Sequence, residues 1–149
     1  TALKLITKNS QPITLIDVGT GSGCIIITLA KLLNKKLGIK NQKLIGLDIS
    51  TKALAVAKQN AKLHGLNKQI ESLPGNLLEP ILNSKFHILN SKLVILANLP
   101  YGWKAWINNC SLDSVGLKFE PAIALFTGEN GLELYKKLFL NHTTSQSLA

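Results

Sequence analysis

A glycine-rich turn between an apolar strand and a helix is the sequence feature that most limits the fold. Residues 13–18 form an apolar run around Asp17, and residues 19–23 read Gly-Thr-Gly-Ser-Gly. Helix-forming apolar residues follow from Cys24 to about Lys36. The apolar run predicts a buried central strand, because strands covered on both faces are apolar throughout. A strand that turns directly into a helix is typical of layered α/β folds.

The chain repeats this alternation of short strands and longer helices. The second helix is predicted to begin after an N-cap at Ser50 or Thr51 and to end near Leu63, where Gly65 supplies the C′ stop. Strands are also predicted at residues 43–47 and 92–97, and a weak strand is predicted at 69–73. A short apolar piece follows at 122–126, and a last amphipathic helix is predicted from 131 to about 140. This order predicts an α/β fold with a mostly parallel sheet and helices on both faces.

Asp48 directly follows the second predicted strand. At this strand end an α/β nucleoside binder places the acid that accepts hydrogen bonds from ribose hydroxyls. The glycines let the backbone approach a ligand, and the helix N-terminus offers unpaired N–H groups. Their spacing is GxGxG, not the GxGxxG of dinucleotide binders. Together these features favour an adenosine-bearing cofactor, while a tight turn without a ligand stays open as the alternative.

The fourth predicted strand runs into Asn98-Leu99-Pro100-Tyr101. The Asn98 carboxamide oxygen and the Leu99 carbonyl can both accept hydrogen bonds, so together they could hold a planar NH₂ group by its two hydrogens. Pro100 stiffens the turn, and Tyr101 offers a face for stacking. The segment therefore predicts a site for an amide or an exocyclic amine, with a turn that has no function as the alternative.

These motifs resemble those of class I S-adenosylmethionine-dependent methyltransferases. The resemblance rests on the segments 16–24, 47–50 and 98–101, together with Ala53-Leu54 and Asn60-Ala61. Downstream, Phe119-Glu120-Pro121, Ala124-Leu125, Thr127-Gly128-Glu129-Asn130-Gly131-Leu132 and Tyr135 are similar to the release-factor glutamine N5-methyltransferases. The downstream segment is the narrower signal, so it carries the family assignment.

The resemblance implies a Rossmann-like class I methyltransferase fold with S-adenosyl-L-methionine as cofactor. Gly19, Thr20, Gly21, Ser22 and Gly23 would line its methionine and ribose side, Asp48 would accept from the ribose, and Asn98 would also lie close to it. The segment Asn98 to Tyr101 would bind the substrate. The implied reaction transfers a methyl group to the side-chain amide nitrogen of the glutamine in the Gly-Gly-Gln loop of a peptide chain release factor.

Two segments depart from the expected pattern. Gly75-Asn76-Leu77 stands where methyltransferases commonly place Gly-Asp and an aromatic residue beside the adenine. Asn76 can bond the adenine amine through its carboxamide oxygen, and Leu77 can cover the ring only by apolar contact. Weaker cofactor binding is therefore expected, with Asn76→Asp and Leu77→Phe expected to tighten it.

Leu99 is the second departure, because the family usually has proline there. Asn-Leu-Pro-Tyr is the form that this motif takes in rRNA adenine dimethyltransferases. An N6-adenine methyltransferase acting on rRNA or DNA is therefore the first alternative. A non-catalytic fragment that binds the cofactor, or RNA through its lysines, is the alternative of another class.

The composition adds few constraints. The net charge is +9, but all 17 basic residues are lysines scattered along the 149 residues, so a nucleic-acid partner is not required. Cys24 and Cys110 lie far apart and no histidines cluster, so no metal site and no disulfide framework are predicted, and a reducing cytoplasm is expected. No apolar stretch of the sequence is long enough to cross a membrane as a helix. The chain is expected to be a monomer.

The motif order predicts that residues 1–149 are a partial methyltransferase catalytic domain, incomplete at both ends. The family's N-terminal helical domain and its later strands would lie outside it, so marginal stability is expected. Trp103 and Trp106 follow the substrate motif and form either a mobile flap or one packed helical face.

Overall fold

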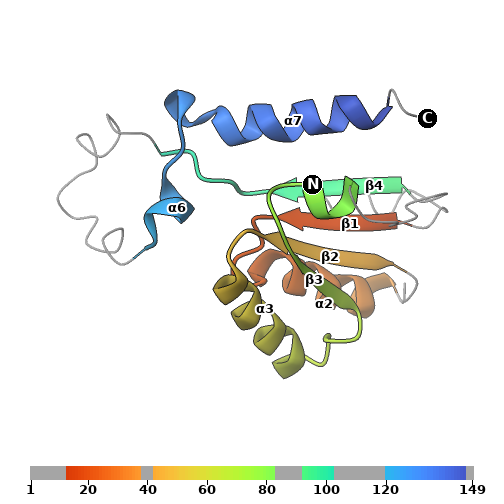
Figure 1. The fold of residues 1–149 in the computed structure, drawn as a ribbon. Coiled ribbons are helices and arrows are strands. Elements are labelled where there is room, and N and C mark those ends of the chain that lie inside the picture. The colour runs from red at the N-terminus through yellow and green to blue at the C-terminus, as the bar shows by residue number, and fades with distance from the viewer. Residues whose placement is uncertain (1–12, 38–41, 83–91, 103–119, 147–149) are drawn as a thin grey trace. The chain divides into compact units, whose positions relative to one another are not determined.

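In a computed structural model, residues 13–37, 42–82, 92–102 and 120–146 are described. The chain divides into two compact units, Thr1–Asn98 and Leu99–Ala149. The elements of the first unit are β1 (Ile13–Val18), α2 (Cys24–Leu37), β2 (Lys43–Asp48), α3 (Thr51–Leu63), β3 (Ile70–Pro74), α4 (Glu79–Leu82) and β4 (Lys92–Ala97). The strands form one sheet in the order β3-β2-β1-β4 with every pair parallel, which confirms the predicted parallel α/β sheet (Figure 1).

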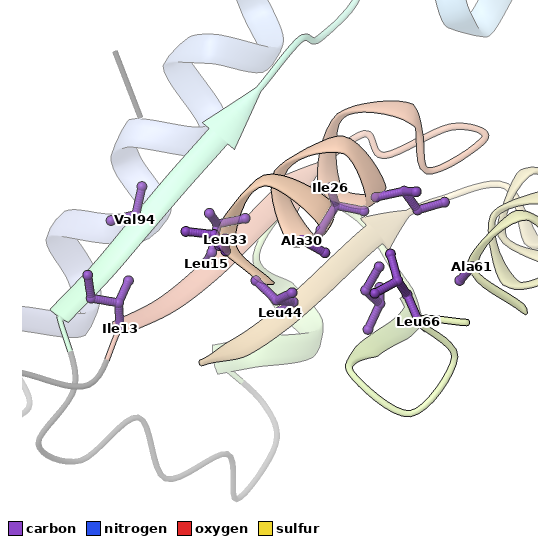
Figure 2. Packing of buried hydrophobic residues seen from close by; sticks show 11 residues of the cluster. Ile13, Leu15, Ile26, Ala30, Leu33, Leu44, Ala61, Leu66 and Val94 are labelled. Carbon is purple, nitrogen blue, oxygen red and sulfur yellow. The ribbon is translucent and has the colours of Figure 1, made fainter. Parts of the chain in front are cut away.

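The core of the first unit lies between this sheet and α2 and α3, which pack on one face of the sheet (Figure 1). Leu15 on β1 is in register with Leu44 and Val94 on the neighbouring strands, and Leu44 is in register with Ile70 on β3. This row meets apolar side chains of α2, among them Ile26, Ala30 and Leu33 (Figure 2). Burying each such leucine or isoleucine contributes about 1.5–3 kcal/mol.

Strand β1 is buried along its whole length, on both of its faces. The side chains of Leu15 and Ile16 point to opposite faces because strand residues alternate, and both are 0% exposed. This agrees with the prediction of a central strand from an uninterrupted apolar run.

Helix α3 begins and ends as the sequence predicts. The Ser50 side chain accepts a hydrogen bond from the Ala53 amide at 3.2 Å, which identifies Ser50 rather than Thr51 as the N-cap. At the other end Gly65 has a φ of 68° and donates to the Lys62 carbonyl, while the Leu66 amide donates to the Ala61 carbonyl at 2.8 Å. This is the Schellman arrangement that a glycine at C′ favours.

In the second unit the elements are α6 (Ala122–Leu125), the 3-10 turn η2 (Glu129–Gly131) and α7 (Glu133–Gln146). The last helix was predicted over 131–140, and both of its bounds are wrong. Asn130 and Gly131 have φ values of 55° and 87°, a left-handed conformation in which an α-helix cannot begin. The helix therefore begins at Glu133 and runs on to Gln146.

Candidate functional site

The predicted site residues of the first unit follow the carboxyl ends of neighbouring strands. Val18 at the end of β1 is in register with Leu47 on β2 and with Ala97 on β4. The glycine loop and Asn98 therefore leave the sheet side by side, and Asp48 follows the strand on the loop's other side. The chain leaves β1 toward β2 while β4 lies on the opposite side, so the strand order reverses between β1 and β4. Parallel α/β sheets bind ligands at such a switch point.

The glycine loop bends sharply over the end of β2. Gly19, Gly21 and Gly23 have φ values of 73°, 57° and 82°, which side chains rarely tolerate. The amides of Gly19 and Thr20 both donate to the Leu47 carbonyl at 2.9 Å. Helix α2 starts directly after the loop, so its N-terminus, whose first amides have no partners within the helix, lies at the site.

Asp48 connects three loops around the site. Its Oδ2 accepts a hydrogen bond from the Gly21 amide and its Oδ1 accepts one from the Ser50 amide, both at 2.8 Å. Its main-chain carbonyl accepts from the Gly75 amide at 3.0 Å. A carboxylate has about four acceptor positions, so each Asp48 oxygen keeps one for a ligand hydroxyl. The half-buried side chain is thus oriented before any ligand arrives.

Beneath the loop lies a buried pair of polar side chains, Asp17 and Thr20. The Thr20 hydroxyl donates to Asp17 Oδ2 at 2.7 Å, while Asp17 Oδ1 is buried without a partner among the described residues. Burial raises the pKa of Asp17 and the Asp48 charge raises it further, whereas the Thr20 hydrogen bond lowers it. Thr20 itself is only 7% exposed, so its side chain supports the loop from below.

Gly46 on β2 makes room for this pair. Gly46 is in register with Asp17, and a Cβ there would lie 3.1 Å from both Cγ2 and Oγ1 of Thr20. Such a contact is tighter than side chains normally accept, so Thr20 takes the space that a side chain at Gly46 would occupy.

Helix α3 holds the far end of the loop. The Asn60 side-chain amide donates to the Ser22 carbonyl at 2.9 Å. A Cβ on Gly23 would approach Ile27 Cδ1 to 3.0 Å and Ala57 Cβ to 3.2 Å. The glycine therefore lets α2 and α3 approach closely at this point.

The loop after β3 carries Asn76 and Leu77. The Asn76 Nδ2 donates to Glu79 Oε1 at 3.1 Å, which leaves the carboxamide oxygen as the acceptor. Leu77 is 6% exposed and has a φ of 49°, a left-handed conformation that is strained for a leucine. Its side chain is packed inside the unit rather than presented to solvent.

The segment Asn98 to Tyr101 spans the end of the first unit and the start of the second. Asn98 is exposed directly after β4. In the second unit the Leu99 side chain is buried at 4% exposure, Pro100 is half-buried, and Tyr101 is 58% exposed. A buried side chain at Leu99 suits a residue whose predicted role belongs to its main chain, and Tyr101 keeps an accessible ring.

Three residues that support the site in the first unit were given no role from the sequence: Asp17, Gly46 and Asn60. Asp17 and Asn60 stand in the segments that carry the family resemblance, and a glycine such as Gly46 inside an apolar strand marks a close approach of other atoms. Trp103 and Trp106 lie outside the described residues. Where residues are described, no three His, Cys, Asp or Glu side chains gather in a metal-binding group, and no helix has the length and hydropathy to cross a membrane.

Comparison with known proteins also indicates a methyltransferase. A family model described as a methyltransferase domain matches residues 9–117. The chain is 38% identical over 128 residues to a release factor glutamine methyltransferase of Enterococcus faecalis, covering 85% of this chain and 40% of that protein. These identities confirm the resemblance inferred from the motifs.

Two further relatives agree. A release factor glutamine methyltransferase of Mycoplasma mycoides is 37% identical over 134 residues, covering 90% of this chain and 43% of that protein. A bifunctional methyltransferase of Rickettsia typhi is 32% identical over 134 residues, covering 90% and 23%. The chain spans less than half the length of each of these relatives.

Proposed function

The chain belongs to the methyltransferase domain family, and on this premise we propose that it transfers a methyl group from S-adenosylmethionine to a glutamine side-chain amide of a peptide chain release factor. The names of its relatives support this substrate. The proposed setting is the cytoplasm, where release factors act, and the proposed form is a monomer.

The observation that best supports the cofactor half is the position of Asp48. Its two carboxylate oxygens are oriented by the Gly21 and Ser50 amides, and each keeps an acceptor position for a vicinal ribose hydroxyl. The free carboxamide oxygen of Asn76 would accept from the adenine amine. We propose that Gly19 to Gly23 and the first turn of α2 line the methionine end, with Leu77 and Asn98 beside the cofactor.

The substrate half is assigned to Asn98, Leu99, Pro100 and Tyr101. When bound, S-adenosylmethionine supplies an electrophilic methyl group on its sulfonium. An amide nitrogen is a weak nucleophile, so the protein's main contribution is to hold that nitrogen in line at near-attack distance. The Asn98 and Leu99 oxygens would accept hydrogen bonds from its two N–H groups and would stabilise the positive charge that develops on the nitrogen. Tyr101 would stack on the flat amide.

Leu99 favours one second candidate, transfer to an exocyclic amine of adenine in rRNA or DNA. The same two oxygens could accept the two hydrogens of that amine. The relatives named for release factors favour the glutamine substrate.

The test is to incubate the full-length protein with methyl-labelled S-adenosylmethionine and, separately, with release factor, rRNA and duplex DNA. Label on the glutamine of the Gly-Gly-Gln loop is the expected result. Label on nucleic acid alone would replace the proposal by the second candidate, and no label on any acceptor would favour a non-catalytic module.

Asn98→Ala is the matching variant. It should abolish transfer, since one of the two acceptors and the in-line geometry are lost. Methylation at the wild-type rate would remove Asn98 from the substrate site. Phe139→Leu serves as the control, because Phe139 is 69% exposed on α7 and has no assigned role.

A further inference from the structure

The segment from Glu120 to Tyr135 carries the narrow family resemblance, yet no part of the proposed cofactor or substrate site uses it. In the second unit it packs against residues 99–102, which contain most of the substrate motif. Its contacts with that motif indicate what the segment does.

The first contact is a short parallel bridge between Gly102 and Phe126. The Gly102 amide donates to the Leu125 carbonyl, and the Thr127 amide donates to the Gly102 carbonyl, both at 2.8 Å. A Cβ on Gly102 would lie 2.6 Å from the Leu125 oxygen, so this close approach requires glycine. The backbone that follows Tyr101 is thereby held in place.

The turn at 128–131 then directs α7 back toward the motif. The Gly128 amide donates to Glu133 Oε2 at 2.9 Å, and Lys137 Nζ donates to Glu133 Oε1 at 2.6 Å. These bonds lower the pKa of Glu133, with Lys137 as the main cause. The turn and the first turns of α7 are therefore tied together, which sets the position of Tyr135.

The second contact is made by the half-buried Tyr135. Its hydroxyl donates to the Leu99 carbonyl at 3.5 Å, which is long for an O–H···O hydrogen bond. A carbonyl oxygen has two lone pairs, so one remains for a substrate N–H. The buried Leu99 side chain holds the same residue from its other end.

We infer that Tyr135 is a positioning residue that orients the Leu99 carbonyl toward the amino group to be methylated. The inference rests on the proposed function, in which that carbonyl accepts a substrate N–H. Tyr135 acts through Leu99 and does not itself touch the substrate.

The test is Tyr135→Phe in the full-length protein, which removes only the hydroxyl. We expect kcat for methyl transfer to fall about tenfold, the effect of one neutral hydrogen bond lost from the transition state. The dissociation constant of S-adenosylhomocysteine and the melting temperature should stay unchanged, and Phe139→Leu on the same helix should leave kcat unchanged.

A wild-type kcat in Tyr135→Phe would overturn the inference. So would a fall in kcat that comes together with weaker cofactor binding and a lower melting temperature, because that pattern marks a structural role. The assay uses whichever acceptor the wild-type protein methylates. If the wild type methylates RNA instead and Tyr135→Phe does so tenfold more slowly, Tyr135 keeps its role but the release factor is not the substrate. If Tyr135→Phe methylates the release factor at the wild-type rate, the release factor is the substrate but Tyr135 has no positioning role.

Discussion

At the scale of single residues, the site depends on two carboxylates that accept hydrogen bonds from within the first unit. Asp48 bonds the Gly21 and Ser50 amides, and Asp17 bonds Thr20 beneath the loop. The two carboxylates differ in burial, because Asp17 is 1% exposed whereas Asp48 is half-buried. Asp48 is therefore suited to bind a ligand, and Asp17 is suited to support the backbone.

Burial of Asp17 predicts a pH-dependent stability. Its pKa is raised above the ordinary value of 3.8, so the folded state holds this proton more tightly than the unfolded state does. Its contribution to stability is full below that ordinary value and is lost as the pH rises through the raised pKa. Asp17→Asn cannot titrate, so the free energy of unfolding of the wild type should fall relative to this variant over that window.

Urea denaturation of both proteins at several pH values measures this difference. A difference that is independent of pH, or one that changes in favour of the wild type as the pH rises, would contradict the raised pKa of Asp17.

The contact between Asn76 and Glu79 changes the effect expected for a substitution at position 76. Asn76→Asp was expected to tighten cofactor binding, but the Asn76 amide donates to the Glu79 carboxylate at 3.1 Å. A carboxylate at position 76 would face Glu79 at that distance and be repelled. We therefore predict that Asn76→Asp alone gives no gain, whereas Asn76→Asp with Glu79→Gln binds S-adenosylhomocysteine more tightly.

Isothermal titration of the wild type, Asn76→Asp, Glu79→Gln and the double variant measures the four dissociation constants. Equal gains in the single and the double variant would exclude the repulsion. Leu77→Phe is expected to be poorly tolerated, because position 77 is buried in a left-handed conformation.

At the scale of elements, the glycine loop is shaped by the strands and helix around it. The Leu47 carbonyl on β2 accepts two of its amides, Thr20 lies over Gly46, and Asn60 of α3 bonds Ser22. A change in a neighbouring element can therefore alter the loop without touching a ligand.

Gly46→Val tests this dependence. Its side chain would displace Thr20 and with it the loop amides, so we expect at least about tenfold weaker binding of S-adenosylhomocysteine, with overpacking that costs about 1–3 kcal/mol of stability. Ser72→Val is the matched control, because Ser72 is in register with Gly46 on β3 and is half-buried. Unchanged cofactor binding in Gly46→Val would show that Thr20 does not set the loop.

The elements also show where local signals suffice. The ends of α3 were predicted from Ser50 and Gly65, because caps satisfy helix-terminal groups through neighbours in the sequence. The start of α7 was predicted wrongly, because Asn130 and Gly131 adopt a left-handed turn that is closed by the Glu133 side chain. The short helix α4 was not predicted at all.

At the scale of the whole molecule, the described sheet has β3 and β4 at its edges (Figure 1). Large apolar side chains are exposed as well, among them Ile123, Phe139 and Leu140. Among the described residues each edge strand is paired on one side only, and a chain of this size buries a smaller share of its surface than a larger domain does.

For the 149-residue chain taken alone we expect marginal stability, below about 5 kcal/mol. Urea denaturation followed by circular dichroism measures it. A sharp, reversible thermal transition with strong stabilisation by S-adenosylhomocysteine would contradict this expectation.

The net charge of +9 belongs to this scale too. Its scattered lysines favour non-specific association with acidic partners rather than a specific site. A release factor acts on the ribosome, so this charge does not separate the glutamine substrate from the rRNA alternative.

The sequence by itself determined the parallel α/β sheet, the place of the glycine loop and the acid at the end of β2. These features depend on apolar periodicity and on turn chemistry, which act between residues close in the chain. Only the tertiary structure decided that Gly46 accommodates Thr20, that Glu79 engages Asn76 and that Tyr135 reaches the Leu99 carbonyl. The contacts at Gly46 and Tyr135 join residues distant in the sequence, and the bond at Asn76 depends on the fold of one loop, so neither periodicity nor propensity encodes them.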